Sequence, residues 1–187
     1  SNILARQLDD RLVATPEILT DLRSFILDRA RSYFHDQGAT TLQLAATMAA
    51  PLGTLADLGS RIVAVGDFMS REEGESLVSA NKRIGNILRK QTLEISTQID
   101  PDLFVFEEEN QLFSVINETE EAVLRGFSQG DYASALERLA ALRQPVDDYF
   151  DRVMVMDEDP AQRGNRLATL ARLKSLFDQV ADFSVVD

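Results

Sequence analysis

The chain has 187 residues, of which 44% are hydrophobic, as expected for one globular domain or two small ones and not for a disordered segment. It has no cysteine, which excludes disulfides, a thiolate nucleophile and zinc–cysteine sites, and no apolar run approaches the length of a membrane span. Its formal net charge is −12. Residues 1–100 hold 11 basic and 13 acidic residues, whereas residues 101–187 hold 8 basic and 18 acidic ones. The second half would therefore repel a polyanion.

The first half of the chain follows the helical period, and we find no convincing strand alternation. The first expected helix begins with Thr15 as N-cap and Pro16, and ends at Gly38. His35 near its end is interpreted as a surface residue, because no strand leads into a Gly-x-Ser-x-Gly turn and a His-Asp metal site needs more histidines. We therefore expect no catalytic residue and no metal site. Further helices are expected over residues 41–50, 54–70 and 70–91, with Thr54 and Ser70 as N-caps and Glu73 completing a capping box.

The pattern lapses between about residues 92 and 106, where the Asp100-Pro101 pair indicates a connection. Beyond it, helices are expected over residues 107–130, 131–143, 145–156 and 160–183. The predicted fold is all-α, a bundle of about eight or nine helices. We expect residues 1–98 and 99–187 to be two helical halves that pack as one unit.

One helix carries a basic stretch, "SANKRIGNILRK", Ser79 to Lys90, with four basic residues and no acidic one. On a helical wheel its basic residues share one exposed stripe with an asparagine: Lys82, Arg83, Asn86, Arg89 and Lys90. Such side chains suit phosphates and base edges, but the same stripe also fits a solvated helix face. Asn81 lies near the apolar side, where we expect it to satisfy a buried backbone group.

The final helix has apolar residues over a wide arc, and Arg166 falls near the middle of that arc. A buried arginine needs a carboxylate partner. We predict a structural ion pair between Arg166 and one of three aspartates just upstream, Asp151, Asp157 or Asp159. Most aromatic residues also recur at helical spacing, so core packing is expected for Tyr33, Phe34, Tyr132, Tyr149 and Phe150. Met154 and Met156 are interpreted as core residues as well.

Several strings resemble the C-terminal region of the bacterial glycyl-tRNA synthetase beta subunit, from about residue 17 to residue 184. They are "ANKRIGNIL", "PVDDYFDRVMVM" and "NRLATLARL", supported by "LRSFILDRARSYFHDQG" nearer the N-terminus. A literal Asp-Ala-Leu-Arg, the motif that names the DALR-type anticodon-binding fold, does not occur; the nearest string is "AALR", Ala140 to Arg143.

This resemblance implies an all-α anticodon-binding domain of a cytoplasmic heterotetramer with two alpha and two beta subunits. In that family the alpha subunit carries the ATP, magnesium and glycine site, while beta recognises the tRNA. The chain would therefore hold no cofactor, would meet no membrane, and would bind the anticodon arm of tRNA-Gly without catalysing a reaction itself. It would support glycine–tRNA ligase activity, and the basic stripe is the candidate surface. Two alternatives stay open: the anticodon domain of another synthetase, arginyl-like, and a helical protein–protein scaffold.

Overall fold

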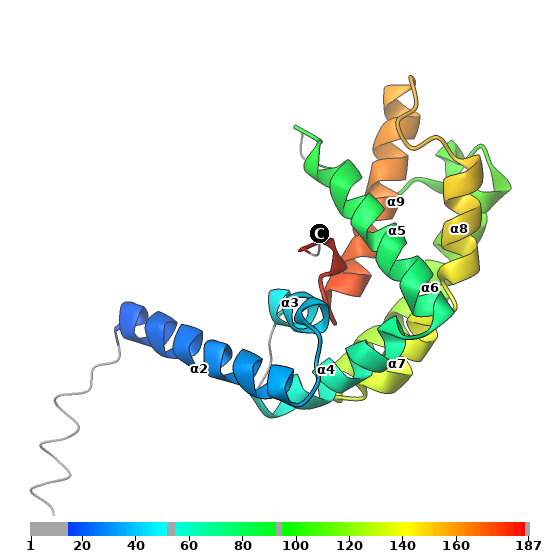
Figure 1. The fold of residues 1–187 in the computed structure, drawn as a ribbon. Coiled ribbons are helices and arrows are strands. Elements are labelled where there is room, and N and C mark those ends of the chain that lie inside the picture. Colours follow the sequence, from blue (N-terminus) through cyan, green and yellow to red (C-terminus); the bar gives the residue numbers. More distant parts are fainter. Residues whose placement is uncertain (1–14, 52–54, 93–94, 186–187) are drawn as a thin grey trace, which may run out of the picture. The chain divides into compact units, whose positions relative to one another are not determined.

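The computed structural model describes residues 15–51, 55–92 and 95–185, and within these ranges every regular element is a helix (Figure 1). The all-α prediction is thus confirmed for the described part of the chain. The α-helices are α2 (Pro16–Asp36), α3 (Thr41–Ala49), α4 (Leu55–Met69), α5 (Glu72–Arg89), α6 (Glu107–Ser128), α7 (Tyr132–Ala140), α8 (Arg143–Arg152) and α9 (Pro160–Asp178). Two short 3-10 helices are η1 (Pro101–Leu103) and η2 (Phe183–Val185). The chain divides into two compact units, Ser1–Gly38 and Ala39–Asp187.

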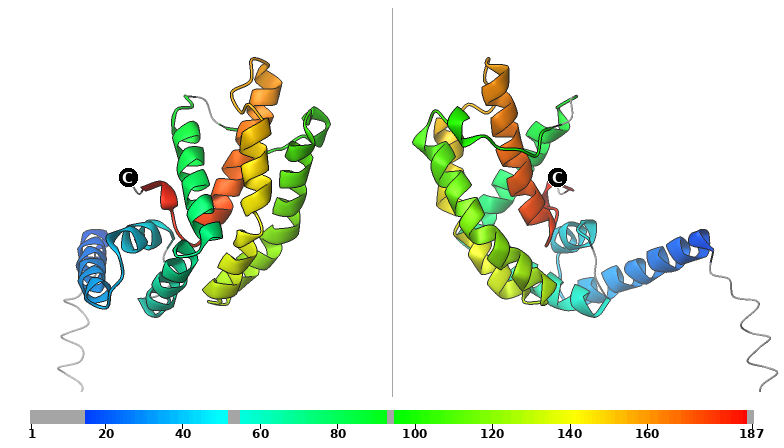
Figure 2. Two further views of the ribbon diagram at one scale, coloured as in Figure 1. Left: turned by 45° about the vertical axis from the view of Figure 1, so that its right-hand side comes forward. Right: turned by 180° about the vertical axis from the view of Figure 1, so that it is seen from behind.

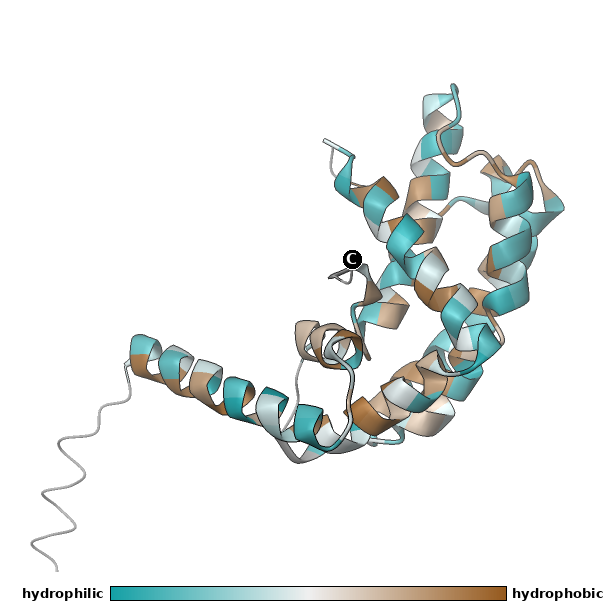
Figure 3. Ribbon diagram, in the orientation of Figure 1, coloured by the Kyte–Doolittle hydropathy of each residue, from teal (hydrophilic) through white to brown (hydrophobic). Residues whose placement is uncertain are grey.

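Helix α2, in the first unit, is capped as predicted. The hydroxyl of Thr15 accepts a hydrogen bond from the backbone N–H of Ile18 at 3.4 Å, and Gly38 ends the helix region with a positive φ of 97°. No residue of α2 is buried, and bands of hydrophobic residues, coloured brown on the ribbon of Figure 3, recur along it. Tyr33 is 60% exposed, so its predicted core role is wrong. The wheel locates an apolar stripe but cannot show whether a neighbour covers it.

The second unit has one hydrophobic core, to which α3 to α9 and η2 contribute. Tyr132 and Tyr149 are buried in it, as predicted, and Phe150 packs against it from its edge. Helix α6 packs on α7 and α8, while α9 lies alongside α5 in both views of Figure 2. The core therefore fixes α5 against the C-terminal part of the chain.

The segment around residue 98 is a connection inside the second unit. Helix α5, before it, packs on α8, α9 and η2, and α4 packs on α7. The connection itself is attached to α9, because the Asn165 side chain accepts from the backbone N–H of Asp100 at 2.7 Å and donates to its carbonyl at 2.9 Å. The two compact units are Ser1–Gly38 and Ala39–Asp187, and helices from both sides of residue 98 contribute to the core of the second unit.

Several helix ends differ from the predictions, among them the start of α5 and the ends of α7, α8 and α9. Helix α5 begins at Glu72 with Arg71 at the N-cap and no side-chain cap, because the Ser70 hydroxyl donates instead to the carbonyl of Asp67 at 2.8 Å. Helix α9 ends at Asp178, and the chain then turns so that the backbone N–H of Asp182 donates to the carbonyl of Ala46 at 2.9 Å. The predicted cap Thr54 lies outside the described residues.

Candidate nucleic-acid interface

Helix α5 presents the predicted basic stripe on one face and buries the other. Arg83, Asn86, Arg89 and Lys90 are exposed, and Lys82 is half-buried. The opposite face holds the buried residues of the helix: Gly74, Leu77, Val78, Ala80, Asn81, Ile84 and Gly85. We call the five predicted residues, Lys82, Arg83, Asn86, Arg89 and Lys90, the α5 stripe. The stripe faces away from the core, so its charges remain available to a ligand.

Close packing behind the stripe fixes the position of α5. A Cβ placed on Gly85 would lie 2.6 Å from the Cβ of Ser184 in η2. Asn81 is fully buried, and neither its amide nitrogen nor its amide oxygen has a hydrogen-bond partner among the described residues. The expected bond from Asn81 to a backbone group is therefore absent, because the nearby backbone groups of α5 bond along the helix.

Three residues of the stripe are held by contacts. The Arg89 guanidinium donates to the side-chain oxygen of Asn86 at 2.5 Å, so these two side chains are linked across one helical turn. The Arg83 guanidinium lies over the ring of Phe150 in α8, 4.2 Å from its centroid. The core role predicted for Phe150 is only partly met, since one side of this ring supports an exposed arginine. Sequence periodicity gave no signal for this pairing between helices.

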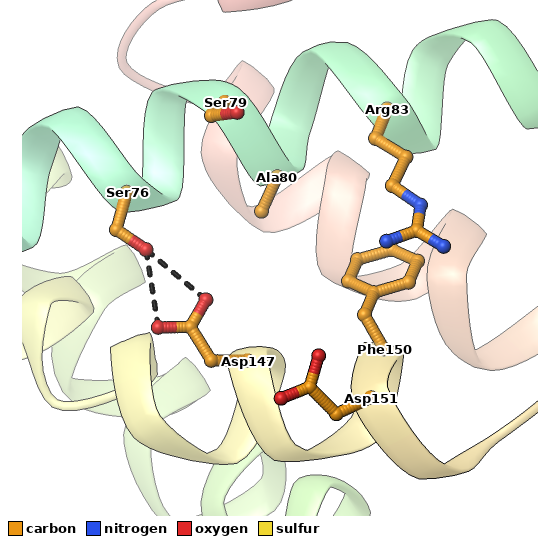
Figure 4. Close-up of a pocket in the computed structure, with 7 residues that line it drawn as sticks. All are labelled: Ser76, Ser79, Ala80, Arg83, Asp147, Phe150 and Asp151. Atoms are coloured by element: carbon orange, nitrogen blue, oxygen red, sulfur yellow. Dashed lines mark hydrogen bonds between the residues drawn. The ribbon is translucent and has the colours of Figure 1, made fainter.

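A pocket of about 410 Å³ opens between α5 and α8 beside Arg83 (Figure 4). We call it the α5–α8 pocket, and its lining residues are Ser76, Ser79, Ala80, Arg83, Asp147, Phe150 and Asp151. The Ser76 hydroxyl donates to both carboxylate oxygens of Asp147, at 3.1 and 3.2 Å. The pocket thus combines an aromatic–guanidinium pair with carboxylates and hydroxyls. Of these residues, sequence reasoning had proposed only Arg83 for ligand binding.

One end of the α5–α8 pocket is bordered by an ion-pair group. Arg143 at the start of α8 contacts Glu72 at 2.5 Å and Asp147 at 3.8 Å. The hydrogen bond that Arg143 donates to Glu72 raises the pKa of Arg143 above its usual value, so this arginine stays charged. These contacts join the first turns of α5 and α8 and hold the two walls of the pocket together.

Arg166 is buried in the second unit and forms ion pairs. Its partners are Asp157, at 2.6 Å, and Glu109, at 2.9 Å. Asp157 is one of the three aspartates predicted from the sequence. Asp159 instead caps α9 through the backbone N–H of Ala161, and Asp151 lines the α5–α8 pocket. Met154 is 72% exposed and Met156 is 48% exposed, so their predicted core role is wrong.

The described residues hold no metal-type cluster of three or more His, Cys, Asp or Glu side chains. No helix in the same ranges has the length and hydrophobicity needed to cross a bilayer. The sequence from Gly126 to Gly130 matches the pattern Gly-x-Ser-x-Gly. This segment lies at the end of α6, where the Ser128 hydroxyl donates to the carbonyl of Arg125 at 2.8 Å. It is therefore a helix end and not a turn that follows a strand.

Comparison with known proteins locates a family within the second unit. The profile of the DALR anticodon binding domain matches residues 77–183, which is more than half of the chain. The chain belongs to this family. The DALR match begins inside α5 and ends at the start of η2, so it includes the α5 stripe and every lining residue of the α5–α8 pocket except Ser76.

The DALR domain and the helices before it are also similar to curated proteins named glycine–tRNA ligase beta subunit. The relative from Nitrosomonas europaea is 39% identical over 170 residues, which cover 91% of this chain and 24% of that protein. The relative from Actinobacillus pleuropneumoniae is 40% identical over 90% of this chain and 24% of its own length. The relative from Glaesserella parasuis is 38% identical over 97% of this chain and 26% of its own length. The predicted resemblance is confirmed, and the chain spans about a quarter of the length of these relatives.

Proposed function

We propose that this chain is the anticodon-arm binding domain of the beta subunit of a glycine–tRNA ligase. The observation that carries the proposal is the DALR anticodon binding domain at residues 77–183, inside a region about 40% identical to such beta subunits over nine-tenths of the chain. In the proposed assembly the alpha subunit supplies the ATP-dependent attachment of glycine with magnesium, and this domain holds tRNA-Gly in the cytoplasm. The chain itself contributes binding and no catalytic residue.

The α5 stripe is the proposed tRNA surface. Its three exposed cations, Arg83, Arg89 and Lys90, project from one helix face with Asn86 among them, and Lys82 lies beside them. Phosphate contacts from Lys and Arg supply most of the salt-dependent affinity of a protein for nucleic acid. Because the chain carries a formal net charge of −12, tRNA must approach through a local basic surface such as this one.

Filter binding of tRNA-Gly tests this proposal. The test variant is Lys82→Glu/Arg89→Glu, which leaves Arg83 and its contact with Phe150 in place. We expect affinity to fall about tenfold or more at about 50 mM salt, and the salt slope to decrease by about 1.4 to 1.8, since each lost phosphate contact contributes about 0.7 to 0.9. The thermal unfolding midpoint should stay nearly unchanged because both side chains lie outside the core.

A matched control reverses two arginines elsewhere in the DALR domain. Arg125→Glu/Arg138→Glu makes the same change in net charge on α6 and α7, where both residues are exposed. It should weaken tRNA-Gly binding much less than the stripe variant does. Equal loss in both variants would show a general charge effect, and unchanged binding in the stripe variant would remove α5 from the interface. The same pair of variants, placed in the full alpha–beta enzyme, should differ in the KM for tRNA-Gly.

A further inference from the structure

The α5–α8 pocket adjoins the α5 stripe, because Arg83 belongs to both. Six other residues line the pocket, and its volume of about 410 Å³ is in the range of small-molecule sites. Its walls come from two helices that pack directly on one another. A ligand that contacts the stripe can therefore place one small planar group in the pocket.

We propose that this pocket holds one unpaired nucleobase that carries an exocyclic amino group, and that Asp151 determines this specificity. The inference rests on the proposed function, in which the α5 stripe binds the tRNA. Cytosine, adenine and guanine have such an amino group, and uracil has a carbonyl at the equivalent position.

A platform for base stacking is already formed in the pocket. The Arg83 guanidinium stacks on Phe150 with 4.2 Å between its central carbon and the ring centroid. Phe150 in turn contacts Tyr149 edge-on at 5.9 Å, and Tyr149 is only 1% exposed. The platform is thus anchored in the core, whereas Arg83 is exposed. Unstacked bases bind on aromatic rings and on guanidinium planes of this kind.

Two carboxylates, Asp147 and Asp151, lie beside the platform together with the hydroxyls of Ser76 and Ser79. An ionised carboxylate only accepts hydrogen bonds, so it attracts an amino group and repels a carbonyl oxygen. The carboxylate of Asp147 already accepts from Ser76 and lies near Arg143. The carboxylate of Asp151 is exposed, and no hydrogen bond or ion pair engages it among the described residues (Figure 4). Asp151 is therefore the carboxylate that remains for a base edge.

Two short RNAs that differ at this group test the inference: hexacytidylate and hexauridylate, each with a 5′ fluorophore, titrated with the 187-residue chain. We expect hexacytidylate to bind about five- to tenfold more tightly, the lower part of the range for one base-edge contact. In Asp151→Ala the ratio should fall to about one. Loss of a negative charge strengthens the binding of both RNAs alike, so the ratio isolates the hydrogen bond from the general electrostatic effect.

Asp102→Ala is the matched control, since this exposed aspartate does not line the pocket and should keep the ratio of the unmodified chain. Arg83→Lys keeps the positive charge but removes the planar guanidinium, so it should weaken the binding of both RNAs. Equal binding of the two RNAs by the unmodified chain overturns the inference alone, as does a ratio that Asp151→Ala leaves intact. Absence of binding to both RNAs and to tRNA-Gly overturns the inference together with the proposed function.

Discussion

The guanidinium of Arg166 and the carboxylate of Glu109 form an ion pair in which each side chain is only 2% exposed, with 2.9 Å between Nε and Oε1. The second oxygen of Glu109 accepts from the backbone N–H groups of Val105 and Phe106, at 2.8 and 3.0 Å. Arg166 also donates to the carbonyl of Met154 at 3.0 Å. The pair thus joins α9, the first turn of α6 and the connection that follows α8.

Replacing Glu109 should strongly destabilise the second unit. Glu109→Gln removes the negative charge that faces the buried Arg166 guanidinium. It also places an amide N–H₂ group where a carboxylate oxygen accepted hydrogen bonds from Arg166 or from the backbone N–H groups of Val105 and Phe106. Loss of one partner of a buried ion pair costs about 3–5 kcal/mol. Urea unfolding followed by circular dichroism measures this free energy. The control Glu107→Gln, at an exposed position in the same helical turn, should cost less than about 1 kcal/mol. Similar losses in both variants would contradict a special role for the buried pair.

Asp157 should make the stability depend on pH in the acid range. The hydrogen bond from the backbone N–H of Asp159 and the one from Arg166 lower the pKa of Asp157 below its usual value of 3.8. Because its folded-state pKa is depressed, Asp157 stabilises the fold at pH values above 3.8, and this contribution is lost as the pH falls through the folded-state value.

Asp157→Asn removes this proton linkage. Its free energy of unfolding should be lower than that of the unmodified chain at pH 7, and the two values should converge as the pH falls below about 3.8. Unfolding curves at pH 7, 4 and 3 measure the difference. A difference that stays constant over this range would show that the Asp157 carboxylate does not titrate with folding.

Two helical glycines should respond in opposite directions to alanine. A Cβ on Gly74 in α5 would lie 1.9 Å from the backbone oxygen of Phe68, which cannot rotate away, so Gly74→Ala should cost at least about 1–3 kcal/mol. A Cβ on Gly164 in α9 meets nothing within 4 Å, so Gly164→Ala should stabilise by about 0.5–1 kcal/mol through helix propensity. Thermal unfolding of both variants gives the sign of each change. Two shifts of the same sign would be inconsistent with the packing of α5 on the end of α4.

Properties that repeat along a helix were predictable from the sequence. The N-cap at Thr15, the exposed α5 stripe and a burial site for Arg166 follow from helical period and from charge. They depend on neighbours within about one turn, which the sequence specifies directly. Asp157 could be predicted as a candidate partner of Arg166 because it lies only 9 residues away in the sequence.

Partners from distant segments were decided only by the tertiary structure. Glu109 lies 57 residues from Arg166, and no local pattern brings the two together. In the same way, the stacking of Arg83 on Phe150 exists because α5 packs on α8. The apolar residues of α2 show the converse, since their helical period marks an apolar face but does not say which segment, if any, covers it. The sequence by itself determined which faces of each helix are polar or apolar, and the packing of helices decided which faces meet, because contact between distant segments depends on the shape of the whole core.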